Sequence, residues 1–201
     1  MTYIGMRRVV TVFLTLTGMA LAATYEVRPE KDTSFALTVA KTGLMRGKKH
    51  LFLFERFQGT LQYDSQHPET AGIQLTIDSR SALCKDAWVS AKELRKISQV
   101  ALEDMLAANR YPTMTFTSSE IKALGGDRYV AQGMLVIRGI SKPVEVNVQL
   151  RSANPTMLWV EGSATIRLSD YGLKPPSAIL GAVGTEDAMA LNFRLAASPV
   201  K

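Results

Sequence analysis

Cysteine is nearly absent from this chain of 201 residues, which contains only Cys84. No disulfide can form within the chain, so packing and hydrogen bonding must stabilise the fold. Cys84 has neither a second cysteine in a CxxC spacing nor a histidine close to it in sequence, and these are arrangements that make a thiol reactive. We therefore predict that Cys84 is a small packed residue before a helix.

Histidine is also scarce, since His50 and His67 are the only two. The sequence contains no HExxH, no GxSxG and no other spacing typical of a metal site or of an activated nucleophile. Both histidines are predicted to lie at the surface. Asp170 and Asp187 occur at predicted turns, where aspartate commonly bonds its own backbone. These features favour a protein that is not an enzyme and that uses neither a metal nor a cofactor.

No apolar run reaches the roughly 20 residues that a membrane-spanning helix needs. The N-terminal run, Val9 to Leu21, follows Arg7 and Arg8 and ends in Ala20-Leu-Ala22, which is the pattern of a secretory signal peptide and its cleavage site. We therefore predict a cleaved signal peptide over residues 1–22. The mature protein is expected to be periplasmic or secreted, without stable insertion into a membrane.

No charge block, repeat or Pro/Ser-rich linker divides the remaining chain, so residues 23–201 are predicted to form one domain. The formal charge of +6 falls to +4 when Arg7 and Arg8 leave with the signal peptide. The basic residues are scattered, apart from Arg46-Gly-Lys-Lys49, and no nucleic-acid-binding motif accompanies them. Charge therefore argues against a nucleic-acid partner, whereas the hydrophobic content of 46% supports a core.

The mature chain contains many segments in which apolar and polar residues alternate. This period of two is typical of a strand with one buried face. Strands are predicted over residues 34–39, 50–64, 72–78, 112–117, 133–137, 144–150, 157–168 and 189–195. About eight strands at near-regular spacing favour an antiparallel barrel or sandwich over a parallel α/β fold.

The predicted strand at 50–64 has apolar residues on both faces. Its odd-numbered residues are expected to face the interior, which leaves Phe52 and Phe54 on the nominal outer face, as Trp159 is on its own strand. These aromatic residues would be covered by another element or would form a contact with a partner. The second alternative suits a homodimer.

The periodicity changes to that of a helix between two of the predicted strands. Ser90 and Glu93 have the spacing of a capping box, in which each residue satisfies a free backbone N–H of the first turn. An apolar stripe at helical spacing runs from Ile97 to Met105. We predict a helical insertion over residues 86–109, with this stripe as its packing face.

The most regular segment is 133–148, in which two apolar runs meet at a compact turn. The valines from Val144 to Val148 alternate with polar residues. Gly139 supplies an unusual backbone conformation in the turn, and Pro143 stands where a strand begins and no donor is needed. The segment is therefore predicted to be a β-hairpin.

This hairpin also carries a recognisable motif. Gly133-x-Leu-x-Ile-x-Gly-Ile-Ser-Lys-Pro-Val144 resembles the G-x-L-T-I-x-G-V-T-K-P-V signature of the YceI-like family. Further segments resemble motifs of the same family in the same order: Phe57-Gln-Gly-Thr-Leu61, Arg110-Tyr-Pro-Thr-Met-Thr-Phe-Thr-Ser118, Ser169-Asp-Tyr-Gly172 and Asp187-Ala-Met-Ala-Leu-Asn-Phe193. The similarity runs through nearly all of residues 24–196.

The resemblance implies an exported, all-β, antiparallel lipocalin-like barrel that is associated with polyisoprenoid binding. Some positions depart from the family's pattern: Asp32 and Lys41 stand where members often have histidine, Val136 replaces a threonine, and Leu168 replaces an arginine. The barrel and its apolar lining are the features that the resemblance carries over to this chain.

A barrel of about eight strands has an interior that side chains can fill or that can hold one small ligand. Gly162 and Ala164 are small, which leaves room for a narrow apolar chain. We therefore predict a lipid-binding protein that holds a polyisoprenoid, an isoprenoid quinone or a fatty acyl chain for transport, storage or sequestration. The alternative is a filled barrel that acts through a dimer or partner surface without a ligand.

The predicted ligand contacts are the inward-facing residues of the strands. They are Phe35, Leu37, Val39, Leu51, Leu53, Phe57, Ile73, Leu75, Ile77, Met114, Phe116, Leu135, Ile137, Val144, Val146, Val148, Leu158, Val160, Gly162, Ala164, Ile166, Leu191 and Phe193.

Overall fold

The computed structural model describes residues 22–154 and 156–200, so the predicted signal peptide lies outside the described residues except for its last position. Within these residues, twelve strands form one antiparallel sheet. They are β1 (Ala23–Arg28), β2 (Ser34–Gly43), β3 (Lys49–Phe54), β4 (Phe57–Tyr63), β5 (Gly72–Asp78), β6 (Ala82–Cys84), β7 (Thr113–Gly125), β8 (Arg128–Ile137), β9 (Ile140–Asn154), β10 (Met157–Arg167), β11 (Ser177–Ala178) and β12 (Val183–Pro199).

The helical part of the chain is small. One α-helix, α1 (Ala91–Gln99), continues into a π-helix, Val100–Met105, within the predicted insertion. Three single 3₁₀ turns span Pro68–Thr70, Ser79–Ser81 and Ser169–Tyr171. Across the described residues, no helix has the length and apolarity needed to cross a membrane.

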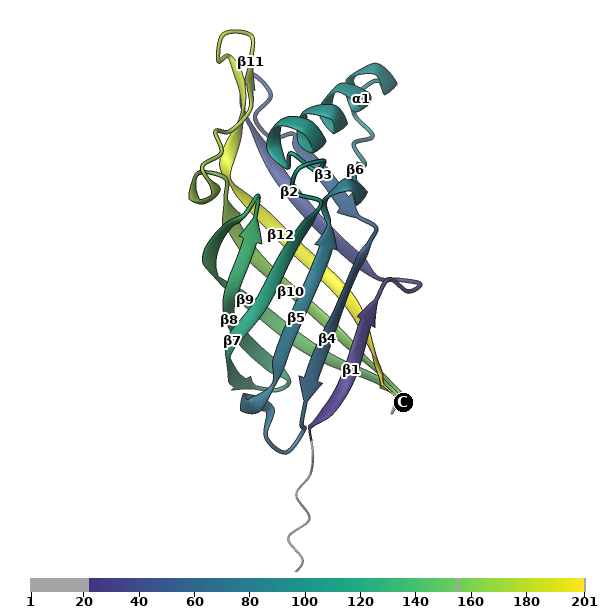
Figure 1. The fold of residues 1–201 in the computed structure, drawn as a ribbon. Helices are drawn as coiled ribbons and strands as arrows, with labels where there is room; N and C mark the ends of the chain where they lie inside the picture. Colours follow the sequence, from purple (N-terminus) through teal and green to yellow (C-terminus); the bar gives the residue numbers. More distant parts are fainter. Residues whose placement is uncertain (1–21, 155, 201) are drawn as a thin grey trace, which may run out of the picture.

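A subset of the strands closes into a barrel, in the order β1-β4-β5-β7-β8-β9-β10-β12. β1 joins the two edges because it pairs with β4 on one side and with β12 on the other. Figure 1 shows these strands wound around one axis. The predicted antiparallel barrel of about eight strands with a helical insertion is confirmed.

The two ends of the barrel differ because β12, which pairs with β10 on one side, changes its partner on the other side along its length. Ala196 to Pro199 pair with β1, whereas Val183 to Arg194 pair with β2. From β2 the sheet extends to β3 and β6, and α1 lies beside these strands at the top of Figure 1. One end is therefore closed by β1, and the other is framed by β2, β3, β6 and α1.

The hairpin of β8 and β9 has a tighter turn than predicted. Arg138 and Gly139 alone reverse the chain, with φ values of 51° and 76°, and positive φ at both positions is what a type I′ turn requires. Pro143 lies inside β9, opposite Met134, rather than at its start. The pairing of β9 with β10 ends at Asn147, so the missing N–H of Pro143 costs no bond on that side.

The segment predicted as one long strand before residue 64 forms two strands, β3 and β4. Phe54 and Phe57 are both buried although they are three residues apart, because the two residues between the strands shift the alternation. The inward face of β3 is therefore the even-numbered one. Leu51 and Leu53 lie on the outer face, contrary to the prediction, and Phe52 faces the interior.

This change of face removes two of the three aromatic residues that suggested a dimer surface. Phe52 and Phe54 are buried. Trp159 is half-buried, and the guanidinium of Arg194 lies 4.6 Å from its ring centroid. A homodimer therefore remains a prediction that these phenylalanines no longer support.

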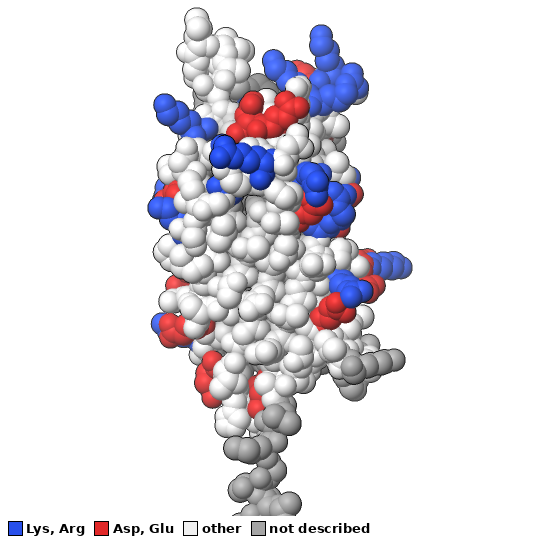
Figure 2. Space-filling view, viewed as in Figure 1, with Lys and Arg blue, Asp and Glu red and all other residues white. Residues whose placement is uncertain are grey.

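The surface charge is unevenly distributed. Figure 2 shows Lys and Arg side chains gathered at the end that carries α1, whereas the middle of the face over β4, β5 and β7 is almost free of charge. The outward residues there are neutral, as in Gln58 and Thr60 on β4 and Thr76 on β5. On this face, charged side chains are thus concentrated at the α1 end.

Candidate ligand-binding site

A large cavity occupies the α1 end of the barrel, and we call it the upper cavity. Its volume is about 760 Å³, within the range of roughly 300–1,000 Å³ that is typical of ligand pockets. Leu37 and Val39 of β2, Phe52 and Phe54 of β3 and Met189 of β12 contribute to its wall. The barrel side of the cavity is therefore mainly apolar.

A smaller cavity, the lower cavity, lies towards the end that β1 closes and measures about 90 Å³. Phe35, Ile77, Leu135 and Leu191 line both cavities and are all buried. We call these four residues the dividing layer. The interior therefore has a large cavity at the α1 end and a much smaller one beyond the dividing layer.

The predicted contact residues that line a cavity separate into three groups along the barrel axis. The upper cavity alone is lined by Leu37, Val39, Met114, Ile137 and Ile166. The lower cavity alone is lined by Ile73, Leu75, Phe116, Val144, Val146, Val148, Val160 and Phe193. The dividing layer supplies the remaining group, and its four members were all predicted.

The other predicted contacts line neither cavity. They are Leu51, Leu53, Phe57, Leu158, Gly162 and Ala164. The reason is clearest at Gly162, where an added Cβ would lie 2.4 Å from Cζ of Phe193. The small residue therefore accommodates the Phe193 ring and not a ligand. Ala164 is buried in the core beside it, and Phe57 packs its ring 6.1 Å from that of Phe35.

The cover of the upper cavity is α1 and the π-helix that follows it. The predicted capping box is confirmed: Glu93 N–H donates to Ser90 Oγ at 3.3 Å, and Ser90 N–H donates to Glu93 Oε2 at 2.9 Å. Ile97, Ala101 and Met105 line the cavity. The apolar stripe of the helical insertion therefore faces the upper cavity and covers part of this end of the barrel.

Polar side chains enter the upper cavity beneath this cover. Lys41 continues the inward row of β2, and His50 projects from β3 with its ring stacked on Trp88 at 5.4 Å between centroids. Burial lowers the pKa of Lys41, and the negative charge of Asp86 partly offsets this effect. The cavity thus has one polar end and one apolar end.

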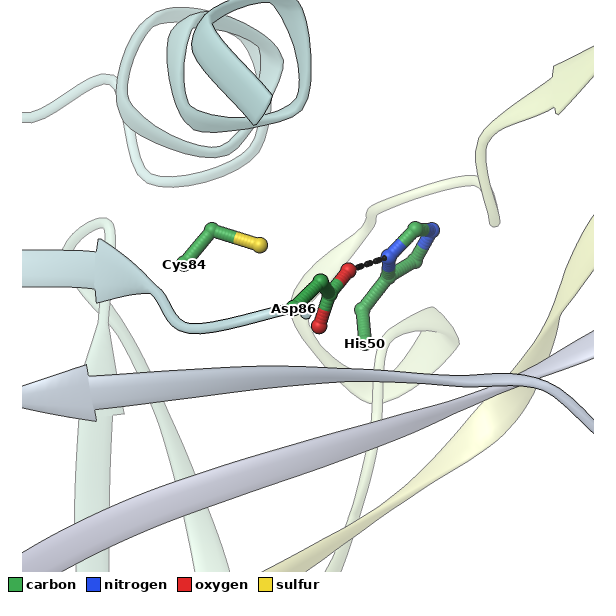
Figure 3. Close-up of side chains that lie close together, drawn as sticks. All are labelled: His50, Cys84 and Asp86. Carbon is green, nitrogen blue, oxygen red and sulfur yellow. Dashed lines mark hydrogen bonds and ion pairs between the residues drawn. The ribbon is translucent and has the colours of Figure 1, made fainter. Parts of the chain in front are cut away.

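Figure 3 shows a cluster of three side chains, His50, Cys84 and Asp86. All three are buried, and His50 lines the upper cavity at its polar end. Pairing of β3 with β6 brings His50 near Cys84 and Asp86, although His50 is far from both in sequence. Asp86 Oδ2 lies 2.5 Å from His50 Nδ1, and Asp86 Oδ1 accepts from Leu51 N–H at 2.8 Å. An ionised carboxylate only accepts, so His50 donates from Nδ1. Burial raises the pKa of Cys84 to about 11.

These three residues could also hold a cation, because one ligand atom from each lies within 4.8 Å of the others. Imidazole, thiolate and carboxylate form a ligand set that suits Zn²⁺. A metal would have to displace the proton between His50 and Asp86 and the proton of the Cys84 thiol. The cluster corrects one prediction, since His50 is only 7% exposed, whereas the His67 side chain is 65% exposed.

The sequence and the fold agree with those of a known family. The model of the YceI-like domain matches residues 9–197. The chain belongs to the YceI-like family.

Relatives and solved structures support this assignment. A UPF0312 protein of Pseudomonas aeruginosa (strain LESB58) is 29% identical over 164 residues, which cover 78% of this chain and 80% of the relative. The crystal structure of Burkholderia cenocepacia BcnA has a TM-score of 0.63 at 23% identity and covers 81% of this chain and 95% of that chain. A polyisoprenoid binding domain from Saccharophagus degradans has a TM-score of 0.59 at 16% identity, with coverage of 90% and 99%. The last two share the fold.

Two of the segments that resemble YceI-like motifs contact each other in the structure. Asp187 of β12 accepts hydrogen bonds from Ser169, at 2.8 Å from N–H to Oδ1 and at 2.7 Å from Oγ to Oδ2. Arg167 approaches the same carboxylate at 3.9 Å. These bonds fix the start of the loop that leads from β10 over the upper cavity to β12.

That loop supplies residues of the upper cavity that were missed from the sequence. Tyr171, Leu173 and Pro176 line the upper cavity although they lie in an irregular segment without alternation. Burial raises the pKa of Tyr171 to about 12, and its hydroxyl has no hydrogen-bond partner among the described residues. Leucine and tyrosine within a proline-rich loop were the only available signal of burial.

Proposed function

We propose that this YceI-like protein is an exported lipid-binding protein that holds one long apolar chain in the upper cavity. The chain would be a polyisoprenoid, an isoprenoid quinone or a fatty acyl group, bound for transport, storage or sequestration. The observation that carries the proposal is the volume of the upper cavity, about 760 Å³, together with its largely apolar wall. The polyisoprenoid binding domain with the same fold supports it by analogy.

The energetics of burial are sufficient without a reacting group. A bound chain that removes several hundred Å² of apolar surface from water gains on the order of ten kcal/mol, before the cost of ordering the chain. Such binding requires shape and apolar lining rather than a nucleophile or a general base. The cavity therefore favours a binding protein over an enzyme.

The alternative of a filled barrel fits only part of the interior. The dividing layer is buried and the lower half is filled except for a cavity of about 90 Å³, which is close to what that hypothesis requires. The upper cavity is many times larger than the lower one and has room for a ligand. This difference favours ligand binding over a purely structural role.

Export is proposed on the pattern of residues 1–22, with Arg7 and Arg8 before an apolar run and Ala20-Leu-Ala22 at its end. Fractionation of the native host, combined with mass measurement of the mature N-terminus, tests it. A periplasmic or secreted chain that begins after Ala22 is expected. An uncleaved chain that stays with the cytoplasmic fraction would contradict export.

Ligand binding is tested by native mass spectrometry of protein purified from its own host, followed by organic extraction. The wild-type protein is expected to carry one apolar chain and to take one up again after extraction. Ala101→Phe should reduce uptake because Ala101 lines the upper cavity. Ala91→Phe is the matched control, since Ala91 lies exposed at the start of α1.

Both variants should unfold at temperatures close to that of the wild type, because one fills empty space and the other faces solvent. A wild-type barrel that arrives empty and accepts no apolar chain would refute the proposal in favour of the filled barrel. Equal uptake by both variants would show that the ligand binds elsewhere than in the upper cavity.

A further inference from the structure

Among the described residues, some charged groups around the upper cavity form hydrogen bonds or ion pairs, and others do not. Lys41, Lys96 and Lys174 line it, together with the carboxylates of Glu93 and Asp104. Lys41 is the most informative because it lies on β2 in the inward row that includes Leu37 and Val39, not on the exposed rim. Its ammonium therefore stands at the polar end of an otherwise apolar wall.

Asp86, which acts on Lys41, and Glu93, which lines the cavity, are already engaged. Asp86 acts electrostatically on Lys41, but its two oxygens bind His50 Nδ1 and the N–H of Leu51. Glu93 accepts from both N–H and Oγ of Ser90 in the capping box. Each of these anions thus has partners other than Lys41.

Within the described part of the chain, the Lys41 ammonium takes part in no hydrogen bond or ion pair. Its half-buried position makes this costly, because partial burial penalises a charge that has no partner. The lowered pKa of Lys41 has the same origin, desolvation by burial. A half-buried cation that makes no hydrogen bond or ion pair at the wall of a cavity is a candidate binding group.

We propose that the ligand carries an acidic head group, a carboxylate or a phosphate ester, which binds the ammonium of Lys41 while its chain fills the upper cavity. This inference rests on the proposed lipid-binding function and specifies its ligand class. The head group lies beneath α1, and the chain runs along Leu37 and Val39 towards the dividing layer. His50 borders the same end of the cavity.

The test compares amphiphiles that differ only in the head group. Protein stripped of lipid is titrated with dodecanoic acid, with dodecanol and with inorganic phosphate alone. The wild type is expected to bind the acid about tenfold more tightly than the alcohol, which corresponds to one charge-assisted hydrogen bond. Inorganic phosphate alone is expected to bind weakly, because it lacks the chain.

Three variants locate the effect. Lys41→Met should remove the preference for the acid and leave affinity for the alcohol unchanged. Lys41→Arg should keep the preference. Lys31→Met is the control, because Lys31 is exposed on the loop between β1 and β2 and lines neither cavity. It should bind both amphiphiles as the wild type does.

The outcomes separate this inference from the function on which it rests. Absence of binding by both amphiphiles refutes the lipid-binding function itself. Equal affinity of the wild type for acid and alcohol, or an acid preference that survives in Lys41→Met, overturns the head-group assignment and leaves lipid binding intact. Binding of inorganic phosphate as tightly as the acid, dependent on Lys41, overturns it in favour of a free-anion site.

Discussion

Gly162 and Phe193 fill the same part of the interior from neighbouring strands. They are direct partners in the register of β10 and β12, and an added Cβ at Gly162 would lie 2.6 Å from the backbone oxygen of Asn147 as well as 2.4 Å from the phenylalanine ring. The glycine is therefore required by a close approach of its neighbours. A sequence shows that a residue is small, but not which partner uses the space.

This contact predicts that Gly162→Ala destabilises the protein by about 1–3 kcal/mol, the usual cost of overpacking a core. Urea unfolding, followed by intrinsic fluorescence, measures the change. Gly72→Ala is the control, because the only atom within 4 Å of a Cβ there is the end of the flexible Gln62 side chain. Equal stability of the two variants would contradict the packing explanation.

For Lys41, the sequence predicts the direction of the side chain but not its interactions. The alternation of β2 placed Leu37 and Val39 inside, and continuing the same period places Lys41 inside as well. Its lack of a partner could not be read from the sequence, because it depends on how Asp86 is engaged by another strand. The inward direction of the Lys41 side chain was therefore predictable, whereas its lack of a hydrogen bond or ion pair was not.

At the level of elements, strands with strict alternation were predictable, and their pairing was not. β5 has the predicted bounds, and the capping box of α1 is present. β1 and β6 were missed because each is short and is defined by partners that are distant in sequence, β4 and β12 for β1 and β3 for β6. The His50 cluster was missed for the same reason, since the pairing of β3 with β6 creates it.

The contact between Ser169 and Asp187 predicts a dependence of stability on pH. The hydrogen bonds from Ser169 lower the pKa of Asp187, and the charge of Arg167 adds to this effect. A carboxyl whose pKa is lower in the folded state contributes fully above its ordinary pKa and loses this contribution as the pH falls through the folded value. The unfolding temperature of the wild type should therefore fall at acidic pH, and protonation of Asp187 should account for part of the decrease.

Asp187→Asn should lower the unfolding temperature at neutral pH and reduce its difference from the wild type under acidic conditions. Calorimetry at a series of pH values measures both effects. Asp170→Asn is the control, because Asp170 lies in the same turn without these bonds. A constant difference between Asp187→Asn and wild type at all pH values would contradict the assignment.

For the whole molecule, the key property is that one barrel has a large cavity at one end and a much smaller one at the other. The closed ring of strands buries the lower half, whereas β2, β3, β6 and α1 enclose a larger volume at the other end. Close packing and cavity volume are therefore concentrated in different parts of the same interior. The dividing layer is the boundary, and it sets the depth available to a ligand chain.

This arrangement predicts that the dividing layer limits chain length. Leu135→Ala removes a side chain that lines both cavities, so the upper cavity should extend towards the lower one and favour longer acyl chains. Leu195→Ala is the matched control, because Leu195 is buried and lines only the lower cavity. Both changes should cost about 2–5 kcal/mol of stability, as is usual for leucine to alanine in a core.

The measurement is competition between saturated fatty acids of increasing length, read by native mass spectrometry at low temperature. Only Leu135→Ala is expected to shift the preferred length upwards, and Leu135→Val should give a smaller shift with less loss of stability. Since the two alanine variants are comparably destabilised, general loosening would shift both preferences equally. That result would show that another part of the cavity, such as the helical cover, determines chain length.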